Sequence, residues 1–213
     1  MLVLRRFKQF FQLNHNAMNR FFLTAFAVCA VVGAANAQIS GGIKAGLNFA
    51  NQDYEEGSFS VSPDGRTGFH AGAYLSIMFS DNVGLQPELL YSAQGSEFDF
   101  AGTETIQKFN YINVPILLKY QVVDILSLHA GPQIGFLASA ETETDGNDED
   151  ISDNIKGSDF SLAFGGQVDL PMGSMGGIRY SLGLSDVNDL DGDDTEVSNN
   201  NFQVYVGFKL FGE

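Results

Sequence analysis

The chain has 213 residues, a formal net charge of −15 and a single cysteine, and its length suits one domain. The four basic and no acidic residues of 1–37 leave a net charge of −19 on the remainder. Nucleic acid is therefore excluded as an expected partner, because phosphate binding needs clustered basic side chains.

Residues 1–37 have the composition of a secretion signal. Met18 opens a short basic start and is the better candidate for the start codon, because residues 1–17 add nothing that a signal needs. The apolar run at 21–32 is too short for a membrane-spanning helix, and 35–37 supply the small residues of a cleavage site. Cleavage would remove Cys29 and with it any disulfide.

Eight segments after residue 37 alternate between apolar and polar residues. In the first, Ile43 and Leu47 share one face, and Lys44 and Asn48 share the other. A period of two predicts a strand, and no helical period follows residue 37. The predicted strands are 39–50, 67–80, 83–97, 108–121, 126–139, 159–170, 175–186 and 201–211.

The connections between these strands alternate strictly between long, acidic ones and short, tight ones. The long ones are 51–66, 98–107, 140–158 and 187–200, and the tight ones lie near residues 81, 124 and 172. This rhythm is typical of an up-and-down barrel that crosses a membrane, where only a closed sheet or a helix pairs every backbone group. We therefore predict an all-β fold: an eight-stranded antiparallel transmembrane β-barrel over 38–213.

Alternation alone leaves the direction of the two faces open, because a soluble eight-stranded barrel would put the apolar face inside, around a ligand. Mid-strand charges and many glycines on the polar face favour a polar interior. Aromatic residues of the apolar face recur near the strand ends, as in interfacial girdles. Pro87, Pro115 and Pro132 lie inside strands and predict local bulges.

Five stretches resemble the PorT-like outer-membrane β-barrel domain of Bacteroidota: GIKAGLN (42–48), LQPELLYS (85–92), YINVPILLKY (111–120), AGPQIG (130–135) and RYSLGL (179–184). The resemblance implies an eight-stranded barrel in the outer membrane of a Gram-negative bacterium, surrounded by lipid and inserted by the barrel-assembly machinery. It implies little about activity. The chain departs from the usual aromatic end of such barrels, since Gly212 and Glu213 follow Phe211.

The polar face carries charges that would lie inside the barrel. We predict an ion-pair plug centred on Glu88, because buried charges need partners. The lumen candidates are Lys44, Glu88, Lys119, Asp169 and Arg179. His129 shares its face with Ser127, but the pair is not a triad and no nucleophile elbow occurs. The sequence therefore predicts no enzyme.

The acidic connections suggest a weak calcium-type site. Asp189, Asp191 and Asp193 surround Gly192, and calcium prefers oxygen ligands, but the spacing of an EF-hand fails. No cofactor is indicated. We predict a structural or surface-interaction role, with an extracellular ligand or a divalent cation bound by the acidic extracellular loops. A small cation-preferring channel is the alternative, and a barrel-embedded lipid-modifying enzyme is less favoured.

Overall fold

The computed structural model describes residues 38–56, 59–61, 64–100, 103–144, 147–152, 155–187 and 196–212. The predicted signal peptide at 1–37 lies outside them. The strands are β1 (Gln38–Glu56), β2 (Phe59–Val61), β3 (Asp64–Met78), β4 (Val83–Phe100), β5 (Thr103–Val123), β6 (Leu126–Thr144), β7 (Asn147–Asp150), β8 (Ser158–Asp169), β9 (Ser174–Gly183) and β10 (Glu196–Phe211).

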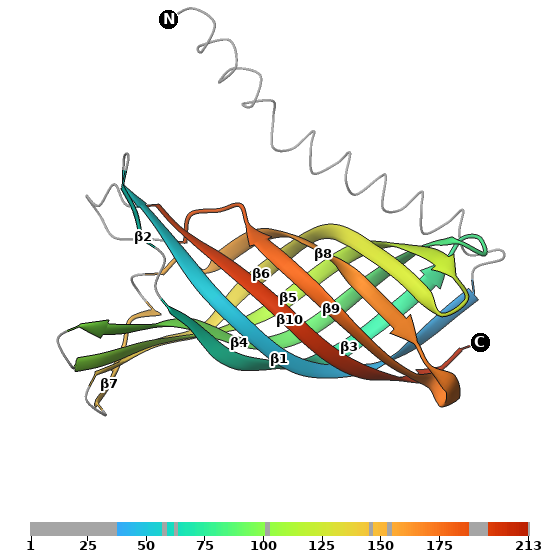
Figure 1. Cartoon of the computed structure of the whole chain (residues 1–213), viewed down its shortest axis with the longest axis horizontal. Coiled ribbons are helices and arrows are strands. Elements are labelled where there is room, and N and C mark those ends of the chain that lie inside the picture. Colours follow the sequence, from blue (N-terminus) through green and yellow to red (C-terminus); the bar gives the residue numbers. More distant parts are fainter. Residues whose placement is uncertain are drawn as a thin grey trace, which may run out of the picture. The chain divides into compact units, whose positions relative to one another are not determined.

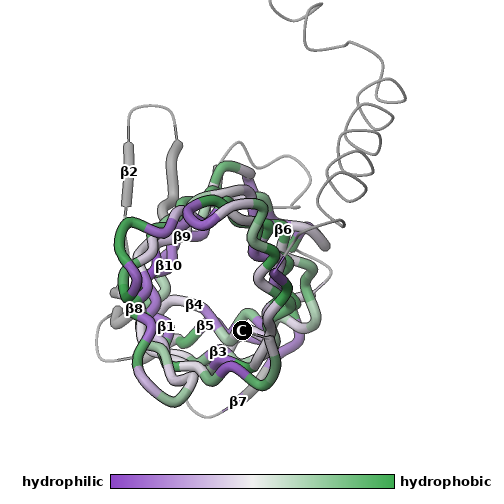
Figure 2. Tube along the Cα trace, turned by 90° about the vertical axis from the view of Figure 1, so that its right-hand side faces the viewer, coloured by the Kyte–Doolittle hydropathy of each residue, from purple (hydrophilic) through white to green (hydrophobic). Residues whose placement is uncertain are grey.

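Eight of these strands close a ring, which Figure 1 shows from the side and Figure 2 end-on. Neighbours follow the order β10-β9-β8-β6-β5-β4-β3-β1, and β10 pairs with β1 to complete the circle. Every pairing is antiparallel. The short β2 and β7 pair only with β1 and β6 and lie off the ring. The predicted eight-stranded antiparallel barrel is confirmed.

The strands are longer than a membrane requires. About 9–11 tilted residues span a bilayer, whereas β5 has 21 and β6 has 19. All four predicted long connections are shorter than expected for this reason, because β1, β6 and β10 extend into 51–66, 140–158 and 187–200. The largest difference is at 98–107, which is mostly hairpin, since β4 and β5 stay paired as far as Phe100 and Thr103. Backbone pairing continues where the strands leave lipid, but the apolar alternation that marks a strand in the sequence ends there.

The tight connections are short, hydrogen-bonded turns. The amide of Phe79 donates to the carbonyl of Val83 at 2.8 Å. A single 3₁₀ turn, Pro171–Gly173, joins β8 to β9, with positive φ at Met172 and Gly173. Among the described residues, no helix is long and apolar enough to cross a membrane.

The prolines do not cause the predicted bulges. Pro87 faces Ile116 and Leu90 faces Asn113, so the register is the same on both sides of Pro87, and it also runs unbroken past Pro132. A slip of one residue would turn the buried charges toward lipid, whereas a proline removes only one ladder hydrogen bond. The irregularities lie elsewhere, between Gly41/Gly42, Gly65/His70, Asn110/Tyr111 and Gln121/Val123.

The two faces point as predicted. On β1, Ile43 and Leu47 are 52% and 50% exposed, whereas Lys44 and Asn48 are 3% and 0% exposed. The outward set ends in aromatic side chains on both sides, such as Phe69 near the long connections and Phe79 at a tight turn. An apolar wall around a polar interior is the arrangement of a membrane barrel.

Candidate functional site: a charged cluster in the lumen

Glu88 and Arg179 meet across the lumen. Arg179 Nη1 donates to Glu88 Oε2 and Nη2 to Oε1, both at 2.8 Å, which is a bidentate pair. Charge-assisted bidentate pairs are among the strongest hydrogen-bonded contacts in proteins. Glu88 comes from β4 and Arg179 from β9, which are four strands apart in a ring of eight. The pair therefore spans the full width of the barrel.

Lys44 of β1 approaches the same carboxylate from a third direction. Its Nζ lies 3.2 Å from Glu88 Oε1 and 3.1 Å from Oε2. The same ammonium lies 3.8 Å from the centre of the Tyr205 ring, a cation–π contact. Gln86 also donates to Glu88, at 2.8 Å. The charged side chains are 0–1% exposed, so the cluster is buried and each of its charges has a partner of opposite sign.

Two histidines border the cluster, each with one ring nitrogen in a hydrogen bond. Arg179 Nε donates to His129 Nε2 at 3.3 Å, so that nitrogen carries a lone pair. Asn48 uses its amide nitrogen to donate to the Phe69 carbonyl, so its oxygen accepts, here from His70 Nδ1 at 2.8 Å. The ion pairs of the cluster thus join two basic side chains to one carboxylate.

The structure does not bring all five predicted charges together. Lys119 Nζ lies 3.6 Å from Asp169 Oδ2, and the Asp169 side chain is 37% exposed. Both residues line a separate polar vestibule of about 380 Å³ at the tight-turn end, next to Asp81, Asp124 and Lys209. The lumen therefore contains a buried three-charge cluster and a wetter pair near one mouth.

The rest of the described lumen is polar and incompletely paired. Buried oxygen or nitrogen atoms of His70, Gln86, Asn113, Ser127, Gln133, Ser181, Asn201 and Gln203 have no hydrogen-bond partner among the described residues. An unpaired buried polar group costs about 1–3 kcal/mol, so we expect ordered water beside these atoms. Ser127 Oγ is one of them, and it makes no hydrogen bond to His129.

Sequence reasoning missed an apolar cluster at the long-connection end. Phe109 and Tyr111 of β5 and Ala140 of β6 are buried there, and Ile151 and Ile155 pack against them. The Ile151 amide donates to the Ala140 carbonyl at 3.0 Å. The connection after β6 is therefore attached to the wall next to it. Its apolar residues sit between acidic ones, and only this packing distinguishes them from solvated loop residues.

The predicted cation ligands Asp189, Asp191 and Asp193 lie outside the described residues. Within the described part of the chain, no group of three or more acidic, histidine or cysteine side chains could hold a metal ion. The calcium-type site at these three residues therefore remains a prediction.

Comparisons with known proteins agree with this architecture. A family model described as "Outer membrane protein beta-barrel domain" matches residues 33–189. No curated protein is significantly similar in sequence.

Among solved structures, the attachment invasion locus protein Ail of Yersinia pestis is 17% identical, with 81% of this chain and 99% of Ail covered and a TM-score of 0.49. Neisserial surface protein A is 13% identical, covering 79% and 97%, with a TM-score of 0.48. OprG of Pseudomonas aeruginosa is 12% identical, covering 82% and 95%, with a TM-score of 0.38.

Proposed function

The chain belongs to the outer membrane protein β-barrel domain family, and on that premise we propose that it is a closed, non-conducting barrel with a structural or surface-interaction role. Membership places it in the outer membrane of a Gram-negative bacterium. We also propose that the barrel belongs to the PorT-like group and that residues 1–37 are removed as a signal peptide. The intact mass of the mature protein would test the cleavage.

One observation carries the non-conducting role: the Arg179–Glu88 pair crosses the ring from β9 to β4. Eight strands give an interior that side chains can fill. Lys44 and Tyr205 occupy the same level from β1 and β10. An ion passing this level would have to separate a buried ion pair, which is strongly unfavourable.

We expect the refolded protein to show no steady conductance in a planar bilayer. A triple variant, Lys44→Ser, Glu88→Ser and Arg179→Ser, removes the three long side chains that meet at this level. Because the flanking lumen is polar, we expect this variant to conduct. Single-channel recording of both proteins at equal insertion measures the difference.

Lys119→Ser is the matched control, because Lys119 lies in the vestibule and not in the cluster. This variant should stay silent like the unchanged protein. Steady cation current through the unchanged protein would favour the channel alternative, which the unpaired polar atoms along the lumen support.

We also propose that the chain is not an enzyme. His129 Nε2 already accepts a hydrogen bond from Arg179, so it is not free to take a proton from Ser127. Both side chains are buried in the lumen, away from the lipid face. Hydrolysis of phospholipid by the refolded barrel in vesicles would contradict this.

The acidic connections are proposed to face the cell exterior, where they could contact a ligand, a partner surface or divalent cations. Long loops of such barrels are extracellular and short turns are periplasmic. A protease added to intact cells should therefore cut within 140–158 or 187–200. Cleavage at the turns near 81, 124 or 172 would instead reverse the orientation.

A further inference from the structure

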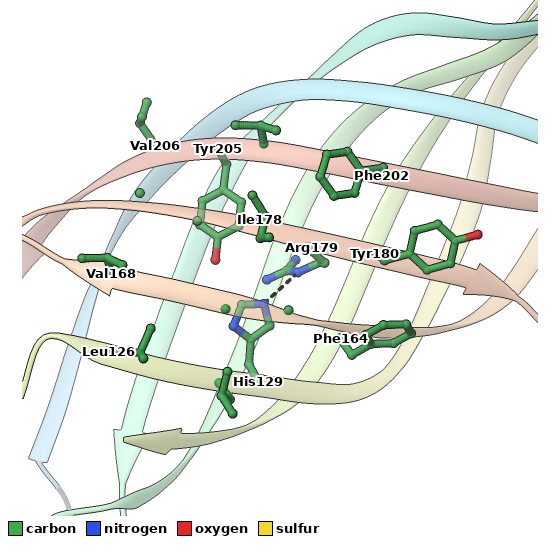
Figure 3. A pocket seen from close by; sticks show the side chains of 16 residues that line it. Leu126, His129, Phe164, Val168, Ile178, Arg179, Tyr180, Phe202, Tyr205 and Val206 are labelled. Atoms are coloured by element: carbon green, nitrogen blue, oxygen red, sulfur yellow. Dashed lines mark hydrogen bonds between the residues drawn. The ribbon is translucent and has the colours of Figure 1, made fainter. Parts of the chain in front are cut away.

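The lipid-facing wall has an apolar groove of about 1060 Å³ over β6, β8, β9 and β10. Figure 3 shows Phe164 and Val168 of β8, Ile178 of β9 and Val206 of β10 among its lining side chains. Arg179, His129 and Tyr205 of the lumen cluster border it from the inner side. Its volume lies just above the usual range for ligand pockets, about 300–1,000 Å³.

Two outward-facing glycines, Gly166 of β8 and Gly176 of β9, help line the groove. A Cβ atom at Gly166 would have no neighbour closer than 3.7 Å, and at Gly176 none closer than 3.8 Å. The barrel's own packing therefore does not require glycine at these two positions. What they do is keep the outer wall hollow.

Lumen-facing glycines contrast with this pair. A Cβ at Gly46 or Gly165 would come within 2.2 Å of a carbonyl oxygen on the neighbouring strand. Those glycines are needed because adjacent strands approach closely on the inner face. No such close approach of strands lies behind the hollow on the outer face, so the space there is open to a group from outside the chain.

The groove lies in the half of the wall next to a tight turn. Gly176 is the third residue of β9, Gly166 is three residues before the end of β8, and Pro171–Gly173 joins the two strands. Short turns of outer-membrane barrels face the periplasm. The groove therefore opens toward the periplasmic leaflet.

We propose that this groove binds one acyl chain of a glycerophospholipid from the periplasmic leaflet. The groove is continuous with the apolar wall that contacts lipid, and its outward lining offers aliphatic and aromatic side chains. A flexible chain can fill a concave surface and gain dispersion contacts along its length. A second barrel is convex and rigid and would leave voids, which close-packed interfaces avoid. The proposal rests on the proposed orientation but not on the closed lumen.

Lipid retention tests the proposal. The mature barrel is refolded into vesicles of phosphatidylethanolamine and phosphatidylglycerol, extracted into mild detergent and measured by native mass spectrometry. We expect one phospholipid to remain on the unchanged barrel. In the double variant Gly166→Leu and Gly176→Leu, new side chains fill the groove, and retained lipid should fall about tenfold, which corresponds to about 1.4 kcal/mol.

Ala71→Leu with Ala73→Leu is the matched control. These two exposed alanines lie on β3, which is four strands from β8 and three from β9 in the ring of eight. The control should retain lipid like the unchanged barrel. If both variants lost the same amount of retained lipid, the loss would come from any change of the outer surface and not from the groove, and the proposal would be overturned.

Two further outcomes also test the lipid site. Unchanged lipid retention in the Gly166→Leu, Gly176→Leu variant would overturn the proposed site. If the unchanged barrel formed a dimer and this leucine variant did not, the groove would be assigned to a second copy instead. If the leucine variant does not fold, Gly166→Ala with Gly176→Ala adds only the Cβ atoms for which there is space, and retention should then fall partially. Conductance is independent of all these results, so a failed plug would not be confused with a failed lipid site.

Discussion

Glu88→Ala should lower the free energy of unfolding by about 3–5 kcal/mol, the usual cost of leaving buried charges without their partner. Arg179 and Lys44 would then lie together in the lumen with no carboxylate between them, at side-chain exposures of 0% and 1%. Urea unfolding in detergent, followed by far-UV circular dichroism, measures the change. The chain contains no tryptophan, so tryptophan fluorescence cannot be used instead.

Glu88→Gln should cost less, because the amide keeps hydrogen-bonding capacity while losing charge. Asp169→Ala is the control within the same lumen. That carboxylate is partly exposed and 3.6 Å from Lys119, and exposed pairs contribute about 0–1 kcal/mol. If Glu88→Ala were no more costly than Asp169→Ala, water would have to solvate the cluster as well as it does the vestibule.

Replacing the whole cluster separates charge from packing. Lys44→Met, Glu88→Leu and Arg179→Met together leave no buried charge, and apolar replacement of a buried ion network is often neutral or stabilising. This triple variant should therefore be more stable than Glu88→Ala alone. The comparison asks whether the cluster stabilises the fold or closes the lumen at some cost to stability.

The sequence identified which side chains face inward but not how high in the barrel each one lies. Parity places Lys44, Glu88, Lys119, Asp169 and Arg179 on one face of their strands. Their heights depend on strand tilt and stagger, which no single strand reveals. Closing the ring brings Glu88 level with Arg179 and leaves Lys119 with Asp169 nearer the tight turns.

The features missed in the sequence share one physical cause: they lie where no lipid enforces alternation. The β4–β5 hairpin extends beyond the predicted strands because backbone pairing needs no apolar face. Ile151 and Ile155 pack against Phe109 although acidic residues surround them in the chain. Within the membrane, by contrast, every strand was predictable from its period of two.

The second large loss of stability is expected from a charge placed on the lipid-facing wall. Leu75→Arg should destabilise the barrel by about 2–4 kcal/mol, the cost of a cation near the bilayer midplane on the outer face of such barrels. Leu75 is 42% exposed on β3, on the outward face that also carries Phe69 and Phe79 toward its two ends. Urea unfolding in lipid vesicles would measure the loss.

Ser76→Arg is the sharpest control, because it places the same side chain one residue further along the same strand and on the opposite face. Ser76 lines the polar vestibule near Asp169, so a new guanidinium there can reach water and a carboxylate. We expect this variant to lose less than half as much stability as Leu75→Arg.

The loss of stability in Ile134→Arg should lie between those of Leu75→Arg and Ser76→Arg. Ile134 lies two residues from the outward Phe136, and the cost of a cation decreases toward the interface. Equal stability of all three variants would mean that the wall does not face lipid, since only an apolar surrounding makes adjacent residues on one strand differ in this way.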